Sequence, residues 1–393
     1  MSARYLWTSR AAAAALAALF LSACAWEATV AFSEYEAGRG TPAGSIRATK
    51  LVPWHGDAWR RLGLSRLDSD PAAATRDLLR ATALNISDAD SLIALGLLAE
   101  SRGELASAER YLIAAAGTSK RFKPQWSLAF FYARRGRPDR FWPAAAIAAG
   151  IPAADATPVF ELAHHWTDNP NEVTARLKLR SQHALLQYLS FLLTKGGAGG
   201  LAELSLRIDV TVDSQAMLLE SCERLIASQR TREAILLWNR MSSELAPERG
   251  ISLTDKHFQH TGGGFRWRAL SNSGVELSSR RDGIRLEFSG NQAEAITLLE
   301  QIVPVLPGRF YHFTFAYRTS GMMGATGLSW RVSGAGPEAQ SPPLAALEAG
   351  AGSLTFRAGP GDLIRIALRC ERPSGSVRLA GAATMVSADL QLL

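Results

Sequence analysis

Small residues recur at a constant spacing of 33 residues in the first half of the chain. Gly63 is followed by Gly96, and Gly103 is followed by Gly136. A period near 34 residues is typical of paired helices that stack on one another, because a single pair cannot bury its apolar face alone. The spacing therefore predicts stacked helical hairpins between Trp54 and Gly150.

The middle copy of this repeat has the apolar pattern of two helices separated by a turn. The turn is expected at Gly103, and Gly96 is the small residue that lets the two helices of one unit approach each other closely. Larger apolar side chains then fill the space between neighbouring units. The first helix shows its apolar face at Leu92, Leu95, Gly96 and Ala99, and the second at Leu105, Ala108, Leu112 and Ala115.

These positions resemble the tetratricopeptide repeat. Three copies keep the opening pattern in phase, with Trp59, Leu62 and Gly63, then Leu95 and Gly96, then Leu128, Ala129 and Tyr132, while Ala108 and Ala115 fit the second helix. The sequence departs from the pattern at Phe141, where a small residue is usual, and after Pro71, where the first copy is one residue short. The resemblance implies repeat-packing roles for Trp59, Gly63, Gly96, Gly103, Ala108 and Gly136. It also implies a groove for an extended peptide or a partner helix.

Helical signals continue to residue 250. Thr157 and Pro158 mark a helix start, and an apolar-periodic run from Ala184 to Leu193 follows. A last hairpin is expected to close the solenoid, with apolar positions at Leu218, Leu219, Cys222, Leu225, Ile226, Ala234, Ile235, Leu237 and Trp238. Most of these stripes are expected to be packing surfaces.

The amino terminus has the pattern of an export signal. Arg4 and Arg10 precede an apolar run from Ala11 to Leu21, and Leu-Ser-Ala-Cys ending at Cys24 has the form of a bacterial lipobox. Cys24 would then be the lipidated first residue of the mature protein. Alternatively the apolar run to Phe32, 22 residues long, is an uncleaved membrane helix, or the leader is removed and the chain released. Both anchored alternatives place the remainder outside the cytoplasm, as the positive-inside rule also favours.

Composition limits the remaining possibilities. A chain of 393 residues is too long for one core, and three cysteines are too few for a disulfide scaffold. Cys222 and Cys370 are expected to be buried free thiols, because they lie in different predicted elements. The net charge of +7 is spread along the chain without a dense basic block, so no nucleic-acid partner is expected.

After Pro247 to Gly250 the apolar period changes from 3.6 to 2, which predicts strands. Glycine and proline clusters separate the runs, as in an antiparallel β-sandwich. We therefore expect three parts: a signal or anchor over 1–32, repeats over 33–250 and a sandwich over 251–393. The alternating apolar sets are Ile284, Leu286 and Phe288, then Tyr311, Phe313, Phe315 and Tyr317, then Ile364, Ile366, Leu368 and Cys370.

The order of segments in this third part resembles jelly-roll carbohydrate-binding modules. The segments are Gly263 to Arg268, Gly283 to Phe288, Gln301 to Gly308 and Tyr311 to Phe315. The sequence departs from the modules at Asp255 to Gln259, so a structural calcium like theirs, with Asp389 as a ligand, is doubtful. Helical repeats between an export signal and such a sandwich resemble envelope proteins of bacterial exopolysaccharide and O-antigen clusters. This resemblance implies a part in polysaccharide assembly or export.

Glycan contacts are predicted at Trp267, Trp330, Arg318, Arg365 and Arg369. Strand alternation places Arg285, Arg318, Arg357, Arg365, Arg369 and Arg378 on solvent faces, which would form one cationic surface if all lay on one sheet. The alternatives are scattered surface arginines and tryptophans that pack in the core.

No catalytic motif is present in the sequence. A Gly-x-Ser-x-Gly elbow, a phosphate-binding loop and a Cys-x-x-Cys pair are all absent, and the adjacent His164 and His165 cannot form an i, i+4 metal pair. We expect no catalytic residue, cofactor or metal. Carboxylate pairs for glycoside cleavage are defined by separation in space, so a glycan-active enzyme with an accessory sandwich stays an alternative.

The sequence thus predicts an α-solenoid of tetratricopeptide-like hairpins followed by an antiparallel jelly-roll sandwich. The expected function is a scaffold tethered to the membrane on the periplasmic side of the cell envelope. Its expected partners are envelope proteins of a polysaccharide machinery, bound by the repeats, and glycan or another protein, bound by the sandwich.

Overall fold

The computed structural model describes residues 2–393 except 153, 197, 247, 248, 250–252, 324, 325, 373, 374, 376 and 377, with side chains from residue 13 onward. The chain divides into two compact units, Met1–Ala184 and Leu185–Leu393, which are described separately.

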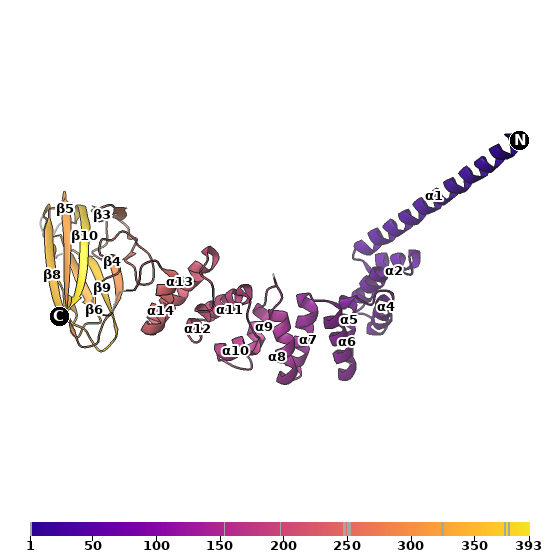
Figure 1. The fold of residues 1–393 in the computed structure, drawn as a ribbon, viewed down its shortest axis with the longest axis horizontal. Helices are drawn as coiled ribbons and strands as arrows, with labels where there is room; N and C mark the ends of the chain where they lie inside the picture. Colours follow the sequence, from indigo (N-terminus) through magenta and orange to yellow (C-terminus); the bar gives the residue numbers. More distant parts are fainter. Residues whose placement is uncertain are drawn as a thin grey trace. The chain divides into compact units, whose positions relative to one another are not determined.

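The described part of the first unit is helical (Figure 1). A long helix α1 is followed by short helices that pair as hairpins, with α3 against α4, α5 against α6 and α7 against α8. The helices are α1 (Ser2–Gly38), α2 (Pro42–Leu51), α3 (Gly56–Ser65), α4 (Pro71–Leu84), α5 (Ala89–Ser101), α6 (Leu105–Thr118), α7 (Phe122–Arg134), α8 (Pro138–Ala149), α9 (Thr157–Ala163) and α10 (Pro170–Arg176).

Local sequence explains where these helices begin. The carboxylate of Asp70 accepts a hydrogen bond from the Ala73 amide at the start of α4, and Pro71 occupies the first turn, where its missing N–H costs nothing. Asp88 caps α5 in the same way by accepting from the Ser91 amide. The first two hairpins thus each contain a helix that begins at an aspartate cap.

Close approach within each hairpin depends on two glycines. A Cβ added to Gly63 would lie 2.6 Å from Leu78 Cγ on α4, and one added to Gly96 would lie 2.8 Å from Leu112 Cγ on α6. Real Cβ atoms are not found that close, so these positions exclude any larger residue unless the leucine shifts. The core of these two hairpins is therefore made mainly of small residues and leucines.

The third copy accommodates the unusual Phe141 by burying it. Its ring lies 5.2 Å from the Trp142 ring and 6.1 Å from that of Trp166, which follows α9. The side chain is fully buried. A large residue in this copy thus fills space toward the segment after α9 that a small residue would leave empty.

The second unit contains further helices and then a β-sandwich. The helices are α11 (Gln182–Lys195), which begins at the end of the first unit, α12 (Leu201–Ser205), α13 (Val212–Ala227) and α14 (Thr231–Met241). The strands are β1 (Arg268–Ala269), β2 (Val275–Arg280), β3 (Gly283–Ser289), β4 (Ala295–Pro304), β5 (Phe310–Ser320), β6 (Leu328–Ser333), β7 (Ala339–Gln340), β8 (Gly350–Arg357), β9 (Leu363–Glu371) and β10 (Ala380–Leu392).

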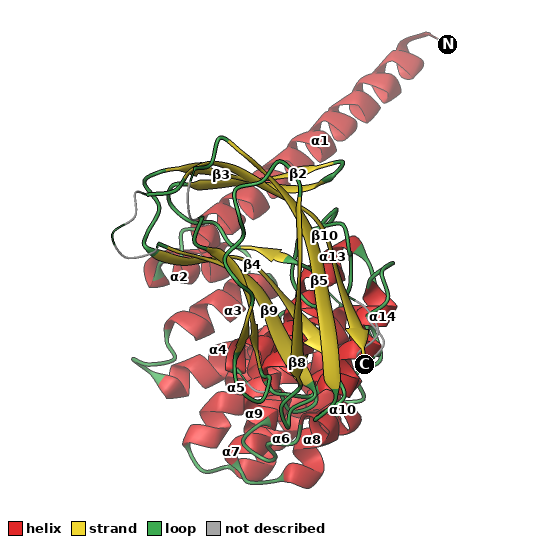
Figure 2. Ribbon diagram, turned by 90° about the vertical axis from the view of Figure 1, so that its left-hand side faces the viewer, coloured by secondary structure: helices red, strands yellow, loops and turns green. Residues whose placement is uncertain are grey.

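The strands form two antiparallel sheets that face each other (Figure 2). One sheet has the order β1-β4-β9-β6-β7 and the other β2-β3-β10-β5-β8. Most neighbours in a sheet are therefore distant in sequence, as in the jelly-roll sandwich that the sequence predicts. The expected fold class, tetratricopeptide-like helical hairpins followed by an antiparallel sandwich, is confirmed.

The change from helix to strand falls between Met241 and Arg268. The predicted boundary at 250 and 251 lies on residues outside the described part of the chain, so it stays a prediction. The compact units divide earlier, and α13 and α14 belong to the same unit as the sandwich.

Candidate functional site

Helices α3, α5 and α7 form one layer of the repeat region and are joined by ion pairs. Asp90 on α5 receives the Arg60 guanidinium from α3 at 3.0 Å and the Lys123 ammonium from α7 at 2.6 Å. The hydrogen bond from Lys123 lowers the pKa of Asp90, although partial burial opposes the shift. We name these three helices the inner layer.

Glu100 provides a second link between α5 and α7. Its carboxylate accepts hydrogen bonds from Arg134 and Arg135, and its side chain is only 9% exposed. Burial by itself raises the pKa of Glu100, but the two guanidinium groups outweigh it and the net shift is downward. The carboxylate is therefore held in its charged form by the fold.

An apolar residue is exposed at the same repeat position on each helix of the inner layer. Leu64, Leu97 and Phe130 follow one another at intervals of 33 residues and are 38%, 48% and 39% exposed. Single exposed leucines are ordinary on protein surfaces, but stacking of repeats turns equivalent positions into a continuous row. We name these three residues the inner ladder.

The inner ladder widens into an aromatic stripe on α7. The ring of Trp126 lies 6.1 Å from that of Phe122 and 5.4 Å from that of Phe130, nearly parallel to both. The Arg134 guanidinium lies 4.2 Å from the centre of the Phe130 ring. Partly exposed aromatic rings and arginine, already fixed by their neighbours, are the residue types that dominate protein-binding surfaces.

The second helices of the hairpins carry a ladder of their own. Leu79 on α4, Ile113 on α6 and Ile147 on α8 follow at intervals of 34 residues and are also exposed. The aromatic pair on α8, Phe141 and Trp142, is buried, so it does not extend the outer ladder into an exposed aromatic stripe. It therefore offers a matched surface against which the inner ladder can be tested.

A cleft of about 670 Å³ lies among the first turns of the inner-layer helices. Its carboxylates are engaged: Asp57 pairs with Arg60 and Arg61, Asp90 with Arg60 and Lys123, and Asp88 caps α5. A general acid needs a raised pKa, whereas Asp57 and Asp90 have lowered pKa values. These groups therefore act in this structure as partners of cations and as a helix cap.

The predicted repeat-packing residues lie in or beside the hairpin interiors. Ala108 is fully buried, and Gly63 and Gly96 make the close approaches described above. Gly103 and Gly136 adopt positive φ angles of 77° and 62° in the turns after α5 and α7. Trp59 is half-buried, and its indole Nε1 donates a hydrogen bond to the Pro53 carbonyl at 2.8 Å.

The predicted cationic face of the sandwich is divided between the two sheets. Arg318 lies on β5 in one sheet, whereas Arg365 and Arg369 lie on β9 in the other. Each has an acidic partner, with separations of 3.1 Å from Arg318 to Asp282, 3.6 Å from Arg365 to Glu300 and 3.3 Å from Arg369 to Glu371. Arg378 precedes β10 instead of lying within a strand. One surface made of all six arginines is therefore not formed.

Trp267 and Trp330 are both fully buried in the sandwich core. Their rings lie 5.6 Å apart, and Phe313 from β5 approaches Trp330 at 5.3 Å. The Trp267 indole Nε1 donates to the Asp255 carbonyl. These positions correspond to the core alternative, because neither ring presents a face to which a sugar could bind.

The residues around Asp389 do not suit a calcium ion. The Lys256 ammonium lies 2.9 Å from its carboxylate, and Asp255 accepts hydrogen bonds from the His257 and His260 amides. The Lys256 ammonium already balances the charge of Asp389, and two backbone amides already donate to the carboxylate of Asp255. Among all described residues, no cluster of three or more His, Cys, Asp or Glu side chains has the arrangement of a metal site.

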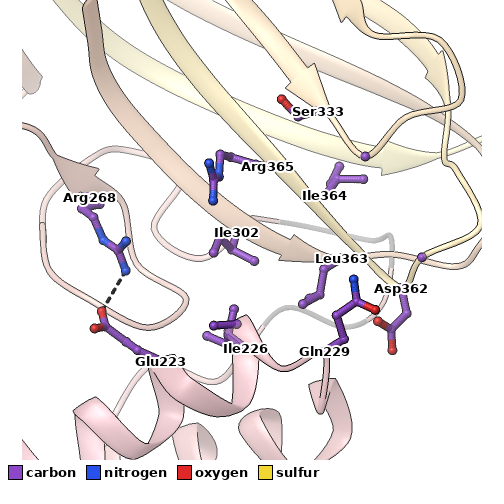
Figure 3. A pocket seen from close by; sticks show the side chains of 13 residues that line it. Glu223, Ile226, Gln229, Arg268, Ile302, Ser333, Asp362, Leu363, Ile364 and Arg365 are labelled. Atoms are coloured by element: carbon purple, nitrogen blue, oxygen red, sulfur yellow. Dashed lines mark hydrogen bonds and ion pairs between the residues drawn. The ribbon is translucent and has the colours of Figure 1, made fainter. Parts of the chain in front are cut away.

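The α13–α14 hairpin packs against the sandwich around a cavity of about 520 Å³ (Figure 3). Glu223 on α13 pairs with Arg268 at 2.8 Å, and the Thr231 hydroxyl at the start of α14 donates to Asp362 at 2.7 Å. The cavity lining combines both signs of charge with isoleucine and leucine side chains. These contacts hold the hairpin on the sandwich.

The three cysteines are unpaired, and only Cys24 is exposed. Burial raises the pKa of Cys222 to about 12 and that of Cys370 to about 11. Both are buried free thiols, as expected from the sequence, and the raised pKa values make them unreactive at neutral pH. Cys24 lies in α1, whose Ala13–Gly38 part is long and apolar enough to cross a membrane and is compatible with a signal peptide or an anchor.

No protein-family model matches the chain, and no curated protein matches it. Parts of it are similar to solved structures. MamA is 22% identical over 36% of this chain and 79% of its own, with a TM-score of 0.27. Pseudomonas aeruginosa pilF is 16% identical over 55% of this chain and 91% of its own, with a TM-score of 0.28. A structure described as CBM4 is 10% identical over 35% of this chain and 98% of its own, with a TM-score of 0.27. We infer no function from similarities at these TM-scores.

The inner ladder was not among the residues predicted from the sequence. The offset of 33 residues that identifies Gly63 and Gly96 also relates the residues that follow them, Leu64 and Leu97. That offset locates equivalent positions but does not tell which of them are exposed, because exposure depends on how neighbouring hairpins stack.

Proposed function

We propose that this protein is a scaffold tethered to the membrane and facing away from the cytoplasm. Its helical repeats bind a protein of a polysaccharide assembly or export machinery, and its sandwich contacts glycan. The three-part organisation over 1–32, 33–250 and 251–393 belongs to the same proposal.

The inner ladder is the observation that carries the protein-binding part. Packed helices lie about 8–10 Å apart, so the ladder offers apolar positions at that spacing. A partner helix with apolar residues at i and i+7 presents them about 10.5 Å apart on one face. A polyproline-like segment presents every third residue at about 9.3 Å. Either form of partner can place one side chain against each inner-layer helix.

Site-specific photo-crosslinking in the native host tests this proposal. A photoreactive residue at Leu97 or Phe130 is expected to capture the same envelope protein of the polysaccharide machinery. The matched controls are Leu79 and Ile113, which are equally exposed but lie on the outer ladder. Capture of the same protein from both ladders, or from neither, contradicts a specific role for the inner layer.

A second experiment connects binding with polysaccharide. The double variant Leu97→Ser with Phe130→Ser is expected to lower surface polysaccharide to the level of a deletion strain, and Leu79→Ser with Ile113→Ser is expected to leave it unchanged. Both double variants remove exposed apolar area, but Phe130 also stacks on Trp126 and Arg134. An unchanged melting temperature of the first variant therefore shows that the loss of polysaccharide does not come from unfolding. Shortened polymer chains after incubation of purified glycan with the intact protein would favour a glycan-active enzyme instead.

The glycan contact is best supported around Arg318. Arg285 on β3 and Arg318 on β5 both pair in register with Thr384 on β10, between them. They line an open cleft of about 560 Å³. Guanidinium groups on neighbouring strands suit the carboxylates of an acidic glycan.

A further inference from the structure

Helix α1 continues without a break from its apolar stretch into the packed part of the first unit. Residues 13–28 are exposed around the whole helix, whereas Ser33, Glu36 and Ala37 are buried. The Ser33 hydroxyl donates to the Ala48 carbonyl on α2 at 3.2 Å, and Glu36 pairs with Arg47 at 2.7 Å. The apolar stretch is therefore attached rigidly to the first repeat.

Two tryptophans stack on each other at this junction. Trp26 lies on α1, and Trp54 lies in the corner between α2 and α3. Their ring centres are 5.3 Å apart with an interplanar angle of 6°, yet the residues stay 49% and 54% exposed. The stack therefore leaves about half of the surface of each tryptophan available to another apolar phase.

The position of Trp26 along α1 indicates which phase that is. The stretch between Arg10 and Glu27 carries no charged residue, and its 16 residues rise about 24 Å. Glu27 interrupts the apolar run that continues to Phe32, so we place the bilayer core on the charge-free residues before it. With an arginine extending toward the headgroups at one flank, this length approaches the roughly 30 Å of a bilayer core. Trp26, next to Glu27, then lies at the outer boundary, where tryptophan is enriched in membrane proteins.

The lipidated alternative places Trp26 at the same depth. Cys24 precedes it by two residues, which is about 3 Å along the helix. A diacylated Cys24 sits at the headgroup level, because its acyl chains insert below it. Trp54 is stacked on Trp26, so both forms of anchoring bring the α2–α3 corner to the lipid surface.

We propose that Trp26 and Trp54 form an interfacial contact with phospholipid that seats the α2–α3 corner on the membrane. The ligand is the boundary between headgroups and acyl chains. The contact adds a second, non-covalent point of attachment, which holds the first repeat at a fixed depth on the lipid surface. This inference rests on the proposed membrane tether.

Quenching by brominated lipid tests the contact directly. The full chain is reconstituted in vesicles of phosphatidylethanolamine and phosphatidylglycerol, with bromine near the headgroup end of the acyl chains. Trp54 stacks on Trp26 of the apolar helix, so Trp54→Phe is expected to lower the lipid-quenched emission measurably. Trp166→Phe, at an exposed tryptophan of the same unit, is expected to remove none.

Flotation of the vesicles distinguishes failure of the lipid contact from failure of the membrane tether. If the chain floats with the vesicles but Trp54→Phe leaves the lipid-quenched emission unchanged, the contact is overturned and the tether stands. If the chain does not float, the tether and the contact fail together. Phenylalanine keeps an aromatic ring in the stack, and an unchanged melting temperature for Trp54→Phe shows that the quenching result does not come from unfolding.

Discussion

Aromatic rings are buried in the core of the sandwich but stack on the surface of α7 in the helical repeats. In the sandwich, Trp330 and Phe313 are fully buried and contact each other. In the repeats, Phe130 and Trp126 stack on the surface of α7, while mainly glycine, alanine and leucine make the interior of the first two hairpins. The difference indicates that the buried rings of the sandwich contribute mainly to its stability, whereas the stacked rings on the surface of α7 are available to a partner.

The largest expected effect comes from removing a buried ring. Trp330→Ala is expected to lower the free energy of unfolding of the sandwich by about 3–5 kcal/mol, because it leaves a cavity among Trp267, Phe313 and Phe315. Trp126→Ala is expected to cost about 1 kcal/mol or less. Denaturant unfolding followed by circular dichroism measures both. Similar losses for the two variants would contradict the comparison.

The hairpin interior is expected to respond to added volume. Gly96→Ala places a Cβ 2.8 Å from Leu112 Cγ and is expected to destabilise the first unit by about 1–3 kcal/mol. Gly117→Ala on α6 is the control, because a Cβ there meets nothing within 4 Å. Relief of glycine's backbone entropy should stabilise that variant by about 0.5–1 kcal/mol. Changes of the same sign in calorimetry would show that Gly96 is not a close-packing position.

The link between α5 and α7 predicts a dependence on pH. The folded-state pKa of Glu100 lies below its unfolded value, so its contribution is complete above an unfolded pKa of about 4.3 and is lost as the pH falls through the lower folded pKa. The melting temperature should therefore fall more steeply below pH 4.3 in the wild type than in Glu100→Gln. Parallel curves for the two proteins would exclude this role of Glu100.

The smallest effect on stability is expected at the surface arginines. Arg318→Gln breaks an exposed pair with Asp282 and is expected to change the free energy of unfolding by about 0.5 kcal/mol or less. Its retention by an acidic polysaccharide gel should nevertheless fall, while Arg369→Gln, on the other sheet, should keep its retention. Equal retention of wild type and Arg318→Gln would remove this residue from the glycan proposal.

Periodicity in the sequence predicts the fold well, because each period reports local geometry. The offset of 33 residues identifies the hairpins, and alternation identifies the buried faces of β3, β5 and β9. Alternation does not tell which sheet a strand joins. Arg318 and Arg365 are separated for that reason, since β5 pairs with β10 whereas β9 pairs with β4 and β6.

The Trp26–Trp54 stack could not be predicted from the sequence for a different reason. Trp26 precedes the repeats and Trp54 stands at their start, so no repeat offset links the two residues. They meet because α2 packs along the end of α1. The exposed inner ladder is intermediate, since its spacing is in the sequence but its exposure is not.

The buried end of α1 also determines what happens to the fold when the leader before Cys24 is removed. Solenoids need a terminal element that shields the first repeat from water, and Ser33, Glu36 and Ala37 provide that shield over α2. Removal of the leader before Cys24 leaves residues 24–38 in place. A processing peptidase can therefore cut this helix without uncovering the repeat beneath it, and the same folded domain results with or without the excised portion.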